Sequence, residues 1–136
     1  MASSLLQSNA RRLLQTTNKK AFANIIQRHM AVVTLSDSKD VGKFNEVNSK
    51  TILYFTATWC PPCKKIKPIY ENLSEKYNEN VAFGKIDVDE NSDSSVEFDV
   101  SAVPTFVFMD KKDVVARFTG ADEGKLEDHI KDLESR

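Results

Sequence analysis

The chain has 136 residues, of which 40% are hydrophobic and only four each are Gly and Pro, so it suits one folded domain with an appended segment rather than a disordered or collagen-like chain. The net charge of −1, without a basic stripe between aromatic residues, argues against a nucleic-acid surface. In the second half, the longest stretch without a charge, Val100 to Met109, is too short to cross a bilayer.

The charge is divided between two parts of the chain. Residues 1–36 contain five basic residues and no acidic one, whereas residues 37–136 contain 14 basic and 20 acidic residues. A helical wheel begun at Leu5 places Arg11 and Arg12 opposite an apolar half. That half contains Leu5, Leu6, Ala10, Leu13 and Leu14. The beginning of the chain is therefore predicted to form a basic amphipathic helix.

This basic segment is rich in Ser, Asn, Gln and Thr and lacks the apolar core of a secretory signal, so it resembles a mitochondrial transit peptide. The stretch Arg28-His29-Met30-Ala31 resembles the context of matrix-protease cleavage. We therefore expect residues 1–30 to be a targeting presequence and residues 31–136 to be the mature domain in the mitochondrial matrix. The alternatives are a chloroplast or cytoplasmic location, and a surface helix or lipid-facing anchor in place of a presequence.

The elements of residues 31–136 follow from apolar spacing. Ala31 to Leu35 predicts a short strand, and Asp37 is the predicted cap of a helix. The predicted inner face of this helix consists of Val41, Phe44 and Val47. The run from Thr51 to Thr56 is typical of a strand buried on both faces. The next helix is expected to run to about Asn78 with a kink at Pro68, and its apolar positions are Ile66, Tyr70, Leu73 and Tyr77.

The remaining elements complete an alternating pattern. They are a buried strand at 81–88, a short helix at 92–98, a hairpin of strands at 105–109 and 114–118, and a closing helix containing Leu126, Ile130 and Leu133. Alternating strands and helices favour a parallel sheet, and the hairpin adds antiparallel strands. The predicted fold class is α/β, a three-layer sandwich with a central mixed sheet and helices on both faces.

The only two cysteines, Cys60 and Cys63, form a C-x-x-C motif between the predicted central strand and the following helix. This spacing allows a disulfide, and a sulfur at a helix start lies near unpaired backbone N–H groups that stabilise an anion. Cys60 is therefore the predicted attacking thiolate. Pro61 and Pro62 suit the first helical positions because they have no N–H to lose.

The helix start alone does not supply enough stabilisation. Ionising half of a cysteine thiol at neutral pH requires about 2 kcal/mol. An exposed helix terminus supplies only about 0.3–1 kcal/mol. We therefore expect a hydrogen bond from the Cys63 thiol and the charges of Lys64 and Lys65 to contribute.

Two other uses of the cysteine pair are less favoured. A zinc site takes more ligands than two cysteines supply, and the only histidines are His29, in the cleavage context, and His129, expected to be exposed on the last helix. A purely structural disulfide with so small a loop restricts the unfolded chain very little. The sequence predicts a redox-active dithiol with no metal and no bound cofactor.

Four motifs in matching order resemble the thioredoxin family from about residue 31 to the end of the chain. They are Phe55 to Lys64 (FTATWCPPCK), Lys85 to Asp89 (KIDVD), Val103 to Phe106 (VPTF) and Gly120-Ala121. The resemblance implies a thioredoxin-like fold and a protein-disulfide reductase in redox homeostasis and electron transport. Cys60 would attack a target disulfide, Cys63 would resolve the mixed disulfide, and a thioredoxin reductase would recharge the pair. It also implies a monomer without nucleic acid or stable membrane association.

The same resemblance implies a target-binding surface. Pro104 matches the family's cis-proline, which places the backbone of Val103 beside the cysteines to pair with an extended target. Trp59 and the Gly120-Ala121 loop match the rest of this surface. Gly120 is equally explained as a turn glycine at the end of a strand.

Three positions concern the support of the active site. Tyr54 stands where the family has a buried Asp, implicated in deprotonating the resolving cysteine, and Lys85 matches the lysine beside that Asp. A neutral Tyr54 would donate or relay a proton rather than act as a base. Without a carboxylate partner, Lys85 is either a solvated charge or part of the catalytic support. Pro61 replaces the usual Gly and is expected to alter the redox potential.

Two alternative functions stay open from the sequence. If replacement of the carboxylate by Tyr54 makes the dithiol slow, the domain would be a binding or chaperone module. Two chains could instead share a metal cluster through their Cys-Pro-Pro-Cys pairs. The reductase is favoured because the cysteine and proline motifs are intact.

Overall fold

A computed structural model describes residues 31–136, so the predicted presequence at residues 1–30, with its amphipathic helix and most of its cleavage context, lies outside the described part. The described chain forms five strands and four helices, in the alternating order that the sequence predicts. They are β1 (Val32–Thr34), α2 (Ser38–Val47), β2 (Lys50–Thr56), α3 (Pro61–Tyr77), β3 (Ala82–Asp87), α4 (Ser92–Glu97), β4 (Thr105–Asp110), β5 (Asp113–Thr119) and α5 (Glu123–Ser135).

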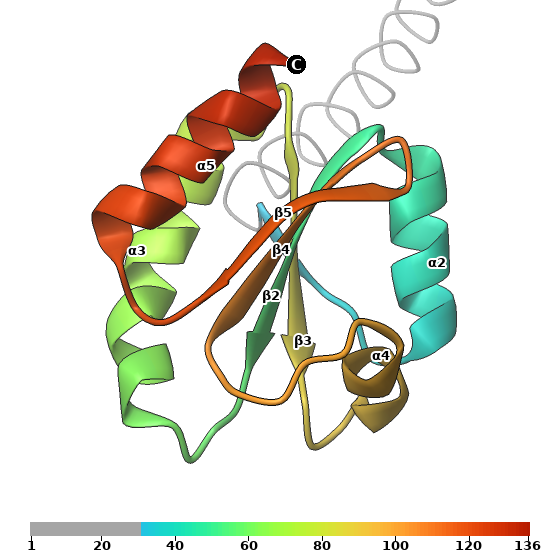
Figure 1. Cartoon of the computed structure of the whole chain (residues 1–136), viewed down its shortest axis with the longest axis vertical. Helices are drawn as coiled ribbons and strands as arrows, with labels where there is room; N and C mark the ends of the chain where they lie inside the picture. Colours follow the sequence, from blue (N-terminus) through green and yellow to red (C-terminus); the bar gives the residue numbers. More distant parts are fainter. Residues whose placement is uncertain (1–30) are drawn as a thin grey trace, which may run out of the picture. The chain divides into compact units, whose positions relative to one another are not determined.

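The strands form one mixed sheet in the order β1-β3-β2-β4-β5. Strands β1, β3 and β2 run parallel, β4 runs antiparallel to β2, and β5 runs antiparallel to β4. Helices α3 and α5 cover one face of the sheet, and α2 and α4 cover the other (Figure 1). The predicted three-layer α/β sandwich is confirmed, with β2 at its centre.

Strand β2 is buried on both faces, as its apolar run predicts. Because alternate side chains of a strand point to opposite faces, Ile52 and Tyr54 join a cluster under α3 and α5, whereas Leu53 and Phe55 join a cluster under α2. We call these the first and second core clusters. The aromatic side chains of the first cluster are Tyr54, Tyr70, Tyr77, Phe83, Phe106, Phe108 and Phe118. Packed on both faces and paired along both edges, β2 rigidly supports the turn that follows it.

Gly84 in β3 allows the second core cluster to pack closely. A Cβ atom at this position would lie 2.8 Å from Leu35 Cδ1 and 3.1 Å from Phe44 Cε1. Both of these side chains are buried in the second core cluster. A side chain larger than hydrogen would therefore push α2 and the chain after β1 away from the sheet.

The inner face of α2 differs from the prediction at one position. Val47, predicted to face inward, is 70% exposed. Each step of three residues turns by about 300° rather than a full circle, so the third residue of such a series leaves the buried face. Asn45 is buried instead, and its Oδ1 accepts a hydrogen bond from Thr51 Oγ1 at 2.8 Å.

His129 on α5 also differs from the prediction. It is half-buried rather than exposed, and its ring lies 5.0 Å from that of Phe108 and 5.3 Å from that of Phe118. The neighbouring Ile130 is fully buried, so this part of α5 lies low enough on the sheet to bring the imidazole onto the first core cluster.

Candidate active site

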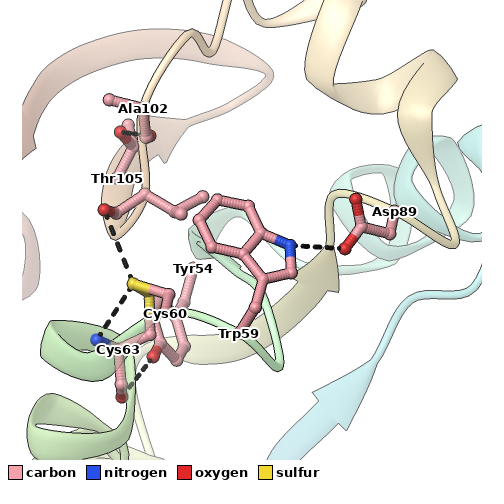
Figure 2. The surroundings of a disulfide bond; sticks show 8 residues. Tyr54, Trp59, Cys60, Cys63, Asp89, Ala102 and Thr105 are labelled. Carbon is pink, nitrogen blue, oxygen red and sulfur yellow. Dashed lines mark hydrogen bonds between the residues drawn. A yellow bond between two sulfur atoms is a disulfide. The ribbon is translucent and has the colours of Figure 1, made fainter.

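The two cysteines lie at the amino end of α3, where the chain leaves β2 (Figures 1 and 2). They form a disulfide with a Cα–Cα distance of 5.2 Å, within the usual range. Cys60 is the N-cap residue, and Pro61 and Pro62 occupy the first two helical positions, as predicted. Because neither proline has an N–H, the first amide of α3 able to donate is that of Cys63. It donates to Cys60 Sγ at 3.2 Å (Figure 2).

This hydrogen bond favours an anionic sulfur at Cys60. The Cys63 N–H, which donates to the N-cap sulfur, and the positive end of the helix dipole both stabilise negative charge on that sulfur. In the disulfide form, the contact predicted from the Cys63 thiol is made by the Cys63 backbone N–H instead. Lys64 and Lys65 are exposed on the same first turn. The sequence predicts the charge at Cys60, and the structure adds a backbone donor directed at that sulfur.

Both cysteines are almost inaccessible in the disulfide form, with 3% of Cys60 and 2% of Cys63 exposed. They cluster with Ala57, and Val103 packs against this cluster. Cys60 Sγ lies 3.7 Å from the carbonyl oxygen of Val103, so this oxygen can accept a hydrogen bond from the Cys60 thiol after reduction. Exposure does not distinguish the two sulfurs, whereas the hydrogen bond from the Cys63 amide does.

Tyr54 reaches the same turn from inside the sheet. Its hydroxyl donates to the carbonyl oxygen of Cys63 at 3.0 Å (Figure 2), and its ring stacks on that of Phe106 at 4.9 Å between centroids. Burial raises the pKa of Tyr54 above its ordinary value of 10.0. Tyr54 is therefore a neutral donor at pH 7, as predicted, and its proton is directed at a backbone carbonyl.

A pocket of about 400 Å³ opens beside Tyr54 and Cys63. Basic side chains along its lining come from Lys64, Lys67 and Lys85, and acidic ones from Asp87 and Glu90. Lys85 is half-buried and makes no ion pair within residues 31–136, so it lacks the carboxylate that the family pattern supplies. The sequence analysis missed Lys67, although its spacing of four residues from Cys63 places both on one side of α3.

Trp59 follows the buried run of β2 and is exposed beside the disulfide. It is 64% exposed, and its indole N–H donates to Asp89 Oδ2 at 2.8 Å (Figure 2). Asp87 Oδ1 accepts the backbone N–H groups of Asp89 and Glu90 at 2.9 and 3.3 Å and so shapes the turn that carries Asp89. The sequence analysis assigned no role to Asp89; the signal was its place in the quoted KIDVD motif.

The loops around Val103, Pro104 and Gly120 meet beside Cys60. The peptide bond between Val103 and Pro104 is cis, as the resemblance implies. The N–H of Gly120 donates to the carbonyl oxygen of Pro104 at 2.9 Å, and its φ of 121° accounts for the glycine as a turn residue. Ala121 follows, half-buried against the first core cluster. The structure thus brings the predicted Val103, Pro104 and Gly120-Ala121 segments to the cysteine side of the sheet.

Comparison with known proteins gives one family. The thioredoxin family model matches residues 31–132. Thioredoxin from Ovis aries is 46% identical over 90 residues, covering 65% of this chain and 85% of the relative. Thioredoxin H4 from Arabidopsis thaliana is 42% identical over 88 residues, covering 65% of this chain and 74% of the relative. The structure of mitochondrial thioredoxin 3 from Saccharomyces cerevisiae superposes with a TM-score of 0.71 at 34% identity, covering 77% of this chain and 98% of that one.

This chain belongs to the thioredoxin family and has the thioredoxin fold. It is a protein-disulfide oxidoreductase whose active-site cysteine pair, Cys60 and Cys63, exchanges a dithiol for a disulfide. Thioredoxins act on protein disulfides together with thioredoxin reductase. Within residues 31–136, no helix has the length and hydrophobicity of a membrane span, and no group of three or more His, Cys, Asp or Glu side chains is arranged to hold a metal.

Proposed function

We propose that the two sulfurs divide the reaction in a fixed order. The Cys60 thiolate attacks a sulfur of the target disulfide, forms a mixed disulfide and releases the other target sulfur as a thiolate. Cys63, as thiolate, then attacks Cys60 Sγ; the Cys60–Cys63 disulfide forms, and the second target sulfur leaves with the electron pair and takes up a proton. The amide of Cys63 directed at Cys60 Sγ carries this assignment, because it stabilises charge on the first nucleophile.

The order of attack can be tested by trapping. A Cys63→Ser variant should retain targets on Cys60 as mixed disulfides in a mitochondrial extract, because no resolving sulfur remains. A Cys60→Ser variant is the matched control and should trap none. Capture by Cys60→Ser but not by Cys63→Ser would reverse the assignment. Cysteine-dependent reduction of insulin by the unmodified protein would also separate the reductase from a module that works by binding alone.

The target-binding surface in this proposal consists of Trp59, Val103, Pro104, Gly120 and Ala121. Its support is the contact between Cys60 Sγ and the Val103 carbonyl, together with the exposed indole of Trp59. An extended target segment would pair with the backbone of Val103 as an added strand. Trp59 would cover one side of that segment while Asp89 holds the indole in place.

We assign the support of the two steps to four residues, with Pro61 and Pro62 acting on the first step and Tyr54 and Lys85 on the second. Tyr54 fixes the Cys63 carbonyl, and Pro61 and Pro62 leave the Cys63 amide as the first donor of α3. Lys85 provides a positive charge in the pocket beside Tyr54, where water would accept the Cys63 proton. A Tyr54→Asp variant would restore a general base, a group that contributes about 10²–10⁴-fold where it acts.

Turnover of Tyr54→Asp near neutral pH should therefore exceed that of the natural chain, with the optimum shifted to lower pH. The measurement is insulin reduction between about pH 6 and pH 9, with Tyr54→Asn as the control that is polar but cannot act as a base. No gain over the natural chain would contradict the assignment of Tyr54 to the position of the missing base.

We further propose that residues 1–30 are a presequence and that residues 31–136 work as a monomer in the mitochondrial matrix. The support is the basic, acid-free beginning of the chain and the likeness to a yeast mitochondrial thioredoxin. The test is import of the full chain into isolated mitochondria, followed by sequencing of the mature N-terminus. Uptake by chloroplasts only, or retention of residues 1–30 in the cytoplasm, would contradict the location. Sedimentation of the mature protein would test the monomer.

A further inference from the structure

The side chain of Arg117 on β5 hydrogen-bonds to the backbone directly after α4. Its Nη1 donates to the carbonyl oxygen of Phe98 at 2.8 Å, and its Nη2 donates to that of Asp99 at 3.1 Å. Asp99 has a φ of 55°, a left-handed conformation that reverses the chain at the end of the helix. A guanidinium presents its donors as a rigid planar fork, so two bonds to successive carbonyls fix both the position and the direction of this backbone.

The sheet places Arg117 for this contact. It pairs with Val107 of β4, a member of the second core cluster, so the two side chains lie on the face covered by α2 and α4. The last turn of α4 has no basic residue of its own. Among residues 31–136, no other side chain donates to the Phe98 or Asp99 carbonyl. Arg117 is therefore the side chain that hydrogen-bonds the end of α4 to the sheet, beside the ring of Phe98, which lies 6.0 Å from that of Phe55 in β2.

Residues 98–104, which we call the pairing segment, lead from this tie to the active site. Val100 and Val103 pack against the second core cluster, while Ser101 and Ala102 between them are exposed. The far end is held where Thr105 Oγ1 donates to the carbonyl oxygen of Ala102 at 2.6 Å. The pairing segment is thus fixed at its start by Arg117 and at its end by Thr105, and the carbonyl beside Cys60 Sγ lies within it.

We propose that Arg117 is a positioning residue for target binding, which holds the pairing segment where an extended target can hydrogen-bond to Val103. The proposal rests on the target-binding surface proposed above. Arg117 donates to backbone that lies outside the disulfide turn, so its loss should weaken binding of targets that need the paired backbone. It should leave the exchange at Cys60 itself intact. Loss of Arg117 is therefore expected to raise the KM for protein disulfides and to leave kcat unchanged.

The test compares two substrates and three variants. Arg117→Met keeps an apolar stem of similar shape and removes the donors, Arg117→Lys keeps one cationic donor, and Lys43→Met removes an exposed cation from α2 as a matched control. Initial rates are measured with insulin and with a small aromatic disulfide that needs no backbone pairing. We expect Arg117→Met to raise the KM for insulin about threefold to thirtyfold. The kcat, the rate with the small disulfide and all values for Lys43→Met should stay unchanged.

Arg117→Lys should recover part of the lost affinity, because an ammonium can reach one of the two carbonyls. Hydrogen exchange should show faster exchange of the pairing segment in folded Arg117→Met and not elsewhere. If Arg117→Met does not fold, the KM of Arg117→Lys for insulin tests the proposal. This KM should exceed that of the natural protein by less than the increase expected for Arg117→Met.

An unchanged KM for insulin would overturn the proposal, and so would equal losses with both substrates, which indicate general damage. Trp59→Ala separates this failure from failure of the target surface. A raised KM for insulin in Trp59→Ala together with a normal KM in Arg117→Met would contradict only the role of Arg117. Normal KM values in both variants would contradict the proposed target-binding surface as well.

Discussion

The reactive turn, residues 60–63, and the centre of the sheet each contain a backbone carbonyl that accepts a hydrogen bond from a buried tyrosine hydroxyl, and the comparison distinguishes a contact at the cysteine pair from one in the core. Tyr54 and Tyr70 are neighbours in the first core cluster, with ring centroids 4.8 Å apart. Tyr70 donates to the carbonyl oxygen of Gly84 at 2.8 Å, inside the sheet, whereas Tyr54 donates to that of Cys63 at 3.0 Å, in the reactive turn. The same kind of contact therefore lies within the sheet in one place and beside the cysteine pair in the other.

Burial has the same direction of effect on both groups. It raises the pKa of Tyr70 well above its ordinary value of 10.0 and raises that of Tyr54 as well. Neither hydroxyl ionises near neutral pH, so both remain donors to their carbonyls. The difference between the two regions lies in what each carbonyl belongs to, a strand of the core or a turn between two cysteines.

The largest expected effect is a complete loss of turnover without a loss of stability. Cys60→Ser should abolish turnover, because a serine hydroxyl does not replace the thiolate in disulfide exchange. Serine is also a favoured N-cap, so the Cys63 amide keeps an acceptor and α3 keeps its start. Insulin reduction and urea unfolding, with reduced natural protein as the reference, measure the two effects. Residual turnover above background would contradict Cys60 as the nucleophile.

The next prediction divides the two tyrosines. Tyr70→Phe and Tyr54→Phe should each lower the free energy of unfolding by about 0.5–1.5 kcal/mol, because each loses one buried hydrogen bond. Only Tyr54→Phe should lower kcat, with mixed disulfide accumulating on Cys60, since only its carbonyl belongs to the reactive turn. Urea unfolding and stopped-flow detection of the intermediate are the measurements. A fall in kcat for Tyr70→Phe as large as that for Tyr54→Phe would end the distinction.

A smaller effect is expected from pH on the sheet centre. The raised pKa of Tyr70 means that the folded state binds more protons than the unfolded state above the ordinary value of 10.0. Its contribution to stability is therefore complete below that pH and is lost as the pH rises towards the raised value. As the pH rises above about 10, the urea midpoint should fall more steeply in the natural protein than in Tyr70→Phe. Parallel curves would contradict this.

The smallest effect concerns a hydrogen bond at the surface of the reactive turn. Asp89→Asn weakens the acceptor of the Trp59 indole, but both groups are exposed to water. The loss of stability should be below about 1 kcal/mol. Fluorescence of this tryptophan, the only one in the chain, should still change as the indole is released. A stability loss as large as that of Tyr54→Phe would show that burial does not set the ranking.

Elements with strong patterns were predictable because one physical requirement determined each of them. The run from Thr51 to Thr56 is buried on both faces because nothing charged interrupts it, and the prolines after Cys60 are at the helix start because they have no N–H to satisfy. The predictions that Val47 is buried and that His129 is exposed were wrong. Apolar spacing defines the buried face of a helix only approximately, and the depth to which a side chain is buried depends on the element it packs against.

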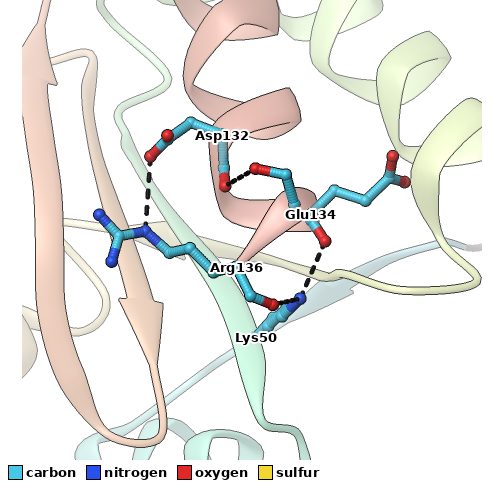
Figure 3. A network of polar contacts seen from close by, with 5 residues as sticks. Lys50, Asp132, Glu134 and Arg136 are labelled. Atoms are coloured by element: carbon cyan, nitrogen blue, oxygen red, sulfur yellow. Dashed lines mark hydrogen bonds and ion pairs between the residues drawn. The ribbon is translucent and has the colours of Figure 1, made fainter.

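Contacts between distant segments could not be predicted in the same way. Nothing near Arg117 in the sequence indicates that its partners are the carbonyls of Phe98 and Asp99, which become neighbours only once β5 joins the sheet. The same is true at the start of β2, where Lys50 Nζ donates to the backbone carbonyls of Glu134 and Arg136 at 2.9 and 2.7 Å (Figure 3).

The double burial of β2 leaves Pro61-Pro62, the exposed dipeptide between the buried cysteines, as the part of this turn that can be exchanged. Its anchor is stabilised by packing on two faces and pairing along two edges, none of which involves the residues between the cysteines. Substitutions of Pro61-Pro62 could therefore be used to tune the chemistry, because the packing and pairing that stabilise β2 do not involve these two residues.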